Sequence, residues 1–218
     1  MLATQFPHAF SSMFDRRILP MLSLAFCTVF APLTASATTE INQPAPVFSG
    51  LGADGSNIKL DAYKGKTVIL EWTNHECPFV VKHYDSGNIP KLQKEATAKG
   101  IVWLQVISSA PGKQGHVDGA SAIKINQYRD AVPSATILDA DGKIGKLYGA
   151  QTTPHLYVIN RAGQLVYKGG IDSIPSANKN DIAKAENYVN STLLALASGK
   201  PVAHPSTRPY GCSVKYAD

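Results

Sequence analysis

One stretch of the sequence, residues 67–84, constrains the fold more than any other. An apolar, β-prone run ends at Trp72, and four polar residues then break the strand pattern. Cys77 follows, and Pro78 comes directly after it. Proline suits the first turn of a helix because the N–H that it lacks has no partner there anyway. The stretch therefore predicts a strand, a loop and a helix, with a cysteine at the start of the helix.

The predicted place of Cys77 indicates a reactive thiol. A helix N-terminus carries a partial positive charge and unpaired N–H groups, which favour a thiolate over a thiol. His75, Lys82 and His83 lie close in the sequence and can add positive charge. The alternative is a buried, inert cysteine, the commoner fate of this residue type. The polar loop before Cys77 favours the reactive interpretation.

The stretch resembles the active-site segment of thioredoxin-fold proteins, in particular the redoxin or peroxiredoxin-like branch, which includes the alkyl hydroperoxide reductase and thiol-specific antioxidant group. The shared pattern is a tryptophan near the end of a strand, followed by cysteine-proline at a helix start. The resemblance covers about residues 45–173 and implies an α/β thioredoxin-like fold, with three layers and a mixed central sheet. It also implies that Glu71 is a buried acid, which would act as a proton relay if it lies behind the thiol; the alternative is an ordinary strand carboxylate paired with a lysine. Thr153 and Pro154 match the cis-proline segment that faces the cysteine and presents backbone to the substrate.

The sequence departs from both branches of that group. Thioredoxin has two cysteines in a C-x-x-C motif, and the second position here is Val80. Peroxiredoxins carry P-x-x-x-T-x-x-C, whereas Leu70 and Asn74 stand at the matching positions before Cys77. The peroxidatic cysteine of peroxiredoxins also aligns with Val80, so the resemblance does not by itself predict peroxidase activity.

Residues 1–37 have the features of a secretory signal peptide. Arg16 and Arg17 form a basic end, residues 18–33 are mostly apolar, and a small-residue A-x-A site ends at position 37. The twin arginine and the possible lipidation of Cys27 are minor alternatives. We therefore predict a periplasmic or secreted protein without a stable membrane span after signal removal.

The regular elements that follow have clear turn and helix signals. A turn at residues 53–55 between short β-prone runs predicts an N-terminal hairpin. A helix over residues 89–99, capped by Asn88, precedes a buried strand at 101–107, and this order implies a right-handed parallel crossover. Shorter elements are predicted further along the chain: helices at 120–129 and 145–150, a strand at 135–138, and an edge hairpin at 155–159 and 165–168.

The clearest helix signal covers residues 178–198. Asn178 is its predicted N-cap, and Gly199 ends it. Its apolar residues fall on one helical face, which predicts packing on the sheet: Ile182, Ala185, Val189, Leu193 and Leu196. The predicted redoxin domain is thus residues 38–198.

Residues 199–218 form a C-terminal segment without periodicity. It is rich in proline and ends in a run with two tyrosines, a valine and Cys212, a composition unlike that of a disordered tail. We expect an ordered arm that packs on the domain. After removal of the signal, Cys77 and Cys212 are the only two cysteines, and an exported protein meets an oxidising compartment. They can therefore pair within one chain.

These residues favour a thiol-dependent oxidoreductase over a nucleic-acid-binding protein, a copper-handling module and a redox-silent module. In the favoured hypothesis, Cys77 exchanges with a disulfide or is oxidised by a peroxide, and Cys212 resolves the product. Its partners are a thiol or disulfide reductant and a peroxide or disulfide substrate, and no cofactor is expected. A formal charge of +5 without any run of Lys or Arg argues against nucleic-acid binding.

Two alternatives stay open at the level of sequence. One is a copper-handling module that uses Cys77 with histidines, for which the candidates are His75, His83, His116 and His155. The other is a redox-silent module in which Cys77 and Cys212 form a permanent disulfide. Closing so long a loop adds about 4–5 kcal/mol of stability in the chain-entropy model.

Overall fold

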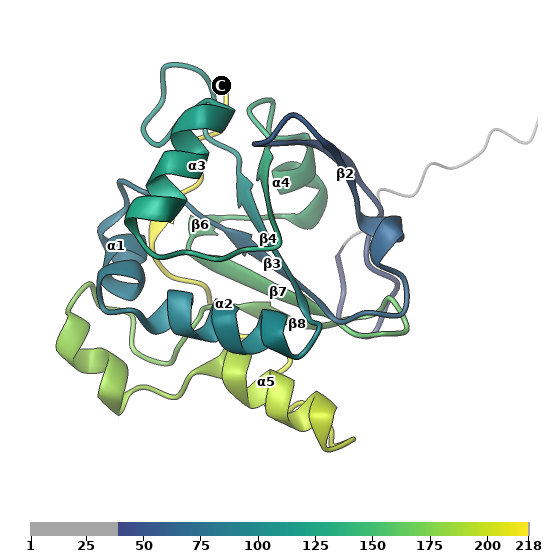
Figure 1. Cartoon of the computed structure of the whole chain (residues 1–218). Helices are drawn as coiled ribbons and strands as arrows, with labels where there is room; N and C mark the ends of the chain where they lie inside the picture. The colour runs from purple at the N-terminus through teal and green to yellow at the C-terminus, as the bar shows by residue number, and fades with distance from the viewer. Residues whose placement is uncertain (1–38, 218) are drawn as a thin grey trace, which may run out of the picture. The chain divides into compact units, whose positions relative to one another are not determined.

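The computed structural model describes residues 39–217 of the chain (Figure 1). The predicted signal peptide therefore lies outside the described residues. The described strands are β1 (Ser49–Gly52), β2 (Asn57–Lys59), β3 (Val68–Trp72), β4 (Val102–Ile107), β5 (Ala135–Leu138), β6 (Thr152–Thr153), β7 (His155–Ile159), β8 (Leu165–Gly169) and β9 (Cys212–Ser213). The α-helices are α1 (Pro78–Asp85), α2 (Asn88–Ala98), α3 (Gly119–Tyr128), α4 (Lys143–Tyr148) and α5 (Tyr188–Ala197). Two 3-10 helices complete them, η1 (Leu60–Tyr63) and η2 (Lys179–Lys184). None of these helices is long and apolar enough to cross a membrane.

Seven strands form one mixed sheet in the order β2-β1-β5-β4-β3-β7-β8. The pairs β3–β4 and β4–β5 are parallel, and the other neighbours are antiparallel. The predicted crossover is confirmed, because α1 and α2 connect β3 to its parallel neighbour β4. The N-terminal hairpin and the edge hairpin of β7 and β8 are also where the sequence predicts them, within a few residues.

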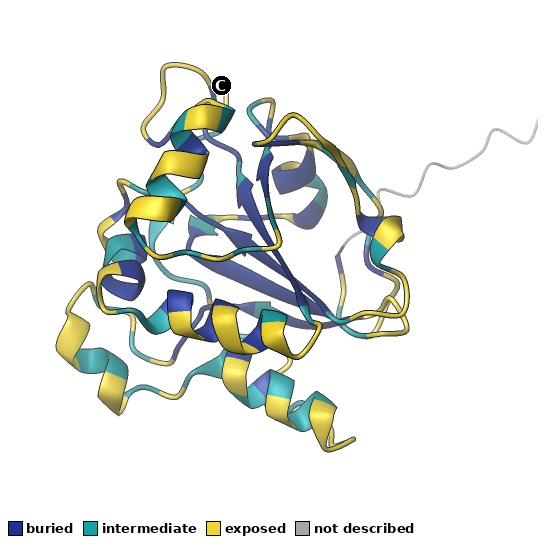
Figure 2. Ribbon diagram, viewed as in Figure 1, coloured by how far each residue is buried: buried dark blue, intermediate teal, exposed yellow. Residues whose placement is uncertain are grey.

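Each face of this sheet has its own apolar core, so the central strands β3, β4 and β7 are buried on both sides (Figure 2). On one face, α1, α2 and α5 pack around Ile69 and Trp103. On the other face, α4 and the N-terminal segment pack around Trp72 and Tyr157. Because side chains alternate along a strand, Glu71 lies on the α1 side of β3 and Trp72 on the α4 side. The arrangement is a three-layer α/β fold, as expected.

The prediction of one continuous helix over residues 178–198 is wrong. Asn178 caps the short helix η2, and Asn187 caps α5 by accepting a hydrogen bond from the Asn190 N–H. Residues 185–187 between the two helices are not helical, because the backbone around them pairs with the chain after β8, through Ser173 N to Glu186 O at 3.0 Å and Tyr188 N to Ile171 O at 3.0 Å. Helical periodicity in the sequence does not reveal this competing partner.

The apolar face predicted for that helix is correct only within α5. Val189 is fully buried there, and Leu193 and Leu196 pack against the same core. Ile182 and Ala185 lie before α5, so they do not continue its face.

The predicted cap of α2 is also wrong. Gly87, in a left-handed conformation with φ 71°, occupies the cap position, and Asn88 is the first helical residue. The Asn88 side chain instead hydrogen-bonds to His83 Nδ1 at 2.8 Å.

Candidate active site

The loop between β3 and α1 is held by hydrogen bonds that the sequence did not reveal. The Asn74 side chain accepts from Glu76 N at 2.9 Å and donates to Gln114 O at 3.3 Å. Glu76 Oε2 accepts from Gly115 N at 2.6 Å. A side chain at Gly115 would collide with Asn74, so glycine is required for this close approach. The loop that precedes the cysteine is therefore tied to the loop after β4.

Cys77 occupies the N-cap position of α1, and Pro78 is the first residue of that helix. The Cys77 side chain is completely buried. Its Sγ donates to the backbone carbonyl of Thr153 at 3.1 Å. The Thr153–Pro154 bond is cis, as the resemblance implies, so these segments from distant parts of the chain face one another.

The C-terminal arm brings Cys212 to the same place. Strand β9 pairs with β6 in antiparallel register, and Cys212 lies opposite Thr153. The Cys212 thiol lies close enough to the Cys77 thiol to influence its ionisation, and both cysteines are free. Gly211 precedes Cys212 and has a φ of 139°, where any Cβ would meet the Thr153 carbonyl. The backbone of the arm thus packs directly against the cis-proline segment, and position 211 has no room for a side chain.

The two thiols differ in their tendency to ionise. Burial opposes ionisation of Cys77, but hydrogen bonds from the Cys212 thiol, the Val80 and Cys212 backbones and Thr153 favour its thiolate. Together they place the pKa of Cys77 below that of a free cysteine. Burial and the hydrogen bond to Cys77 raise the pKa of Cys212 to about 11. Cys77 is therefore the better nucleophile of the pair at neutral pH.

The nearby cationic residues do not act as the sequence suggested. Burial lowers the pKa of His83 to about 4, so this ring is neutral at pH 7. Burial also lowers the pKa of His75. Lys82 is completely buried, and its ammonium group is paired with Asp172 at 3.4 Å. Hydrogen-bond donors around the sulfur, and not histidine charge, lower the pKa of Cys77.

Glu71 is buried, but its hydrogen bonds lead away from the thiols. Its carboxylate accepts from Tyr84 Oη at 2.6 Å, Trp103 Nε1 at 2.7 Å and Gln93 Nε2 at 3.2 Å. Burial raises the pKa of Glu71. The carboxylate makes no hydrogen bond to Cys77 among the described residues, so a proton relay from Glu71 needs an intermediary. The contacts favour a structural role in a buried polar network.

The histidines proposed as copper ligands are dispersed. Both ring nitrogens of His83 are engaged, with Asn88 and Tyr210, and His155 lies on the α4 side of the sheet beside Tyr157. His116 Nδ1 hydrogen-bonds to the Ser109 carbonyl. Within residues 39–217, no group of three or more His, Cys, Asp or Glu side chains is placed to hold a metal ion.

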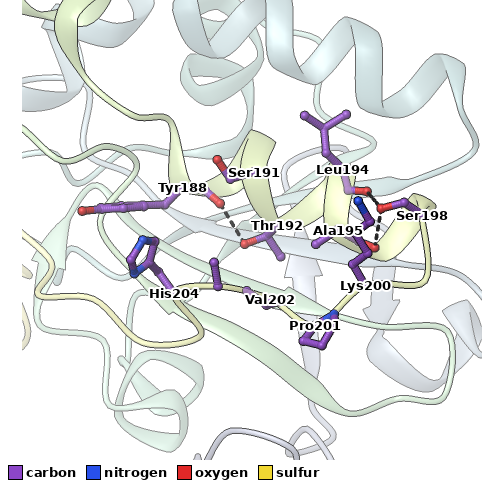
Figure 3. Close-up of a pocket in the computed structure, with 11 residues that line it drawn as sticks. Tyr188, Ser191, Thr192, Leu194, Ala195, Ser198, Lys200, Pro201, Val202 and His204 are labelled. Atoms are coloured by element: carbon purple, nitrogen blue, oxygen red, sulfur yellow. Dashed lines mark hydrogen bonds between the residues drawn. The ribbon is translucent and has the colours of Figure 1, made fainter.

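Of two surface pockets, one lies away from the predicted site residues and the other lies beside the arm that carries Cys212. A pocket of about 280 Å³ lies between α5 and residues 200–204, and none of the predicted site residues lines it (Figure 3). Its hydroxyl groups on Thr192 and Ser198 bond to carbonyls of their own helix. A pocket of about 540 Å³ lies along the arm, where Thr152, Tyr210 and Gly211 line it. The second pocket is thus the one next to the paired cysteines.

The comparisons with known proteins agree with this geometry. Residues 40–188 match the family model described as Redoxin. The chain belongs to the redoxin family. No curated protein is similar enough to match this redoxin.

Solved structures show the same fold. An uncharacterized conserved protein from Geobacillus kaustophilus is 23% identical to this redoxin, with a TM-score of 0.68, over 83% of this chain and 94% of the other. A hypothetical protein from Sinorhizobium meliloti 1021 is 21% identical, with a TM-score of 0.65, over 83% and 97%. A putative thiol:disulfide interchange protein DsbE from Chlorobium tepidum is 22% identical, with a TM-score of 0.50, over 60% and 85%. At these identities, the likeness shows the thioredoxin-like fold.

Proposed function

We propose that this redoxin is an exported thiol–disulfide oxidoreductase in which Cys77 and Cys212 form the exchanging pair. The observation that carries the proposal is that the two cysteines meet at Thr153 of the cis-proline segment, where Cys77 Sγ donates to the Thr153 carbonyl and Cys212 pairs with Thr153 across β6 and β9. The predicted signal peptide supports export to the periplasm or the exterior, where disulfides form and persist.

The arrangement supports a reaction in two steps. The Cys77 thiolate attacks one sulfur of a substrate disulfide, and the other sulfur leaves as a thiolate that takes up a proton. Cys212 then loses its proton and attacks the Cys77 sulfur, which releases the second substrate thiol and leaves a Cys77–Cys212 disulfide. Two electrons pass to the substrate, and a reducing thiol or dithiol returns them to the protein. The pair can run in the opposite direction when it meets a substrate dithiol.

Several details favour disulfide exchange over peroxide reduction. Leu70 and Asn74 replace the proline and threonine of the peroxiredoxin motif, and Val80 stands where that group has its peroxidatic cysteine. A peroxide would instead oxidise Cys77 to a sulfenic acid, which Cys212 would convert to the same disulfide with release of water. In both reactions Cys77 is the attacking residue, Cys212 the resolving residue, and Thr153 with Pro154 the backbone opposite the reacting sulfur.

The Cys212→Ser variant tests the two-cysteine mechanism. The hydroxyl fits the place of the thiol but cannot resolve a mixed disulfide. We expect the variant to stop after one turnover of an excess of a chromogenic aryl disulfide, with the reagent attached to Cys77, while the wild type with a dithiol reductant turns over repeatedly. Intact-mass measurement and peptide mapping detect the adduct.

The neighbouring Ser213→Ala variant is the matched control, because Ser213 is exposed on the same short strand. It should turn over as the wild type does. Repeated turnover by Cys212→Ser at the wild-type rate would show that Cys212 is not the resolving residue.

A further inference from the structure

Tyr210, two residues before Cys212, makes ring and hydroxyl contacts with α1 and with Asp172. Its ring meets Phe79 of α1 edge to face, with the centroids 5.9 Å apart, and Lys82 Nζ lies 5.7 Å from the ring centroid. Its hydroxyl donates to Asp172 Oδ1 at 2.5 Å and lies 3.3 Å from His83 Nε2. The arm is therefore joined at Tyr210 to the same helix that begins at Cys77.

The acceptor of the Tyr210 hydroxyl, Asp172, and its ion-pair partner, Lys82, are both buried. Lys82 and Asp172 are 1% and 4% exposed, and they are paired at 3.4 Å. Such a pair has a large desolvation cost, so it needs further hydrogen bonds to be stable. Asp172 obtains them from Tyr210 Oη and from Ile174 N.

His83 completes a directional chain of hydrogen bonds. Its ring is neutral and completely buried, and Nδ1 accepts from the Asn88 amide. Nε2 therefore carries the ring hydrogen and donates to the Tyr210 oxygen, which in turn donates to Asp172. Each donor in this chain has one acceptor. The Tyr210 hydroxyl thus bridges His83 and Asp172, whose Nε2 and Oδ2 atoms lie 3.7 Å apart.

Only Gly211 separates Tyr210 from Cys212. Its backbone lies so close to the Thr153 carbonyl that the chain has little freedom between the two residues. Further hydrogen bonds hold the chain after Cys212, with Val214 N donating to Gln151 O at 3.0 Å and Tyr216 Oη to Ala150 O at 2.8 Å. A constraint on Tyr210 is therefore passed directly to the resolving cysteine.

We propose that Tyr210 is a positioning residue that holds the arm over Cys77 through its contacts with Asp172, Lys82 and His83. These contacts are called the latch. This inference rests on the proposed exchange function. The latch favours one reaction of Cys77 and slows another. It raises the effective concentration of Cys212 at Cys77, which favours the intramolecular disulfide. It also keeps Cys77 covered in the reduced protein, which slows attack by external reagents.

The Tyr210→Phe variant separates these consequences from a general loss of stability. It keeps the ring against Phe79 and removes only the hydroxyl. We expect the Cys77–Cys212 disulfide to become about tenfold less favourable in equilibrium with reduced and oxidised glutathione, because a hydrogen bond to a charged group is lost. In this equilibrium, one glutathione disulfide and the two protein thiols give the protein disulfide and two glutathione thiols.

The second readout uses the Cys212→Ser background, in which Cys77 is the only cysteine of the chain after removal of the signal peptide. Adding Tyr210→Phe should raise the rate of Cys77 alkylation by iodoacetamide several-fold, since the arm opens more often. Tyr148→Phe is the matched control, because its buried hydroxyl donates to Pro46 O on the other face of the sheet. It should lower the melting temperature without changing either readout.

Tyr210→Phe with an unchanged redox equilibrium and an unchanged alkylation rate would overturn the latch. So would changes that Tyr148→Phe reproduces in full. If the wild type forms no Cys77–Cys212 disulfide, the exchange function fails instead. The alkylation comparison still tests the latch in that case, because it does not require the disulfide.

Discussion

Cys77→Ser is expected to abolish reduction of external disulfides, with a fall of at least roughly 1,000-fold, as for loss of other catalytic nucleophiles. The hydroxyl is a poor nucleophile without a strong base, and within residues 39–217 no carboxylate or charged histidine contacts this position. The serine side chain is smaller but similar in shape, and it can still donate to the Thr153 carbonyl. The fold should therefore be retained, which circular dichroism and thermal unfolding can check.

The same variant identifies the ionising thiol. Because Cys77 is buried, its thiolate is best followed by ultraviolet absorbance, which needs no reagent to reach it. The wild type should show a thiolate step below the pKa of about 8.5 of free cysteine, and Cys77→Ser should lack that step. Cys212→Ala removes a hydrogen-bond donor to the thiolate, so it should raise the midpoint. A wild-type midpoint above the free value, together with full activity of Cys77→Ser, would show that Cys77 is an inert buried cysteine.

Glu71→Leu is expected to cause the largest loss of stability among these variants, about 3–5 kcal/mol, because it leaves three buried hydrogen-bond donors without this acceptor. The hydroxyl of Tyr84 and the N–H groups of Trp103 and Gln93 would lose their acceptor. The guanidinium of Arg129, stacked 3.9 Å above the Tyr84 ring, would lose the favourable charge of Glu71. Two of its nitrogens, Nε and Nη1, have no hydrogen-bond partner among the described residues, so little else compensates.

The pH dependence of this effect has a definite sign. Burial raises the pKa of Glu71, so between its ordinary and raised pKa the folded protein binds more protons than the unfolded chain. The contribution of Glu71 to stability therefore falls as pH rises through that window. The difference in free energy of unfolding between the wild type and Glu71→Leu is largest at the acid end of the window. Chemical denaturation over a pH series measures it.

Glu95→Leu is the control for the Glu71 prediction. Glu95 is half exposed, and its ion-pair partner in the described part of the chain is Lys91 on α2, so its loss should change stability by no more than about 0.5 kcal/mol. A similarly small effect of Glu71→Leu would contradict the structural role. If Glu71 is a proton relay instead, Glu71→Gln should slow disulfide exchange far more than its fraction of unfolded protein explains.

Local sequence predicted the parts of the site that depend on neighbouring residues. The strand that ends at Trp72, the polar loop and the helix that begins after Cys77 follow from periodicity and from Pro78. The resemblance supplied the cis bond at Thr153–Pro154, which no local pattern requires.

Contacts between distant segments were beyond this kind of prediction. The complete burial of Cys77 results from packing beneath the arm, and the split of the predicted helix at residues 185–187 results from pairing with the chain after β8. The buried Lys82 gives no signal in its own helix, because its partner Asp172 is 90 residues away. The arm was predicted to be ordered from its aromatic residues and cysteine, but its direction depends on the pairing of β9 with β6.

One measurement tests the central claim most directly, namely that Cys77 and Cys212 are a redox-active pair within one chain. The chain without its predicted signal peptide is equilibrated in buffers with graded ratios of reduced to oxidised glutathione. It is then quenched with acid and alkylated, and its disulfides are identified by peptide mass mapping. We predict an intrachain Cys77–Cys212 disulfide whose occupancy follows the glutathione ratio, with a potential above about −300 mV. Free thiols at every ratio, dimers linked through Cys212 alone, or a disulfide that glutathione does not reduce at any ratio would contradict it.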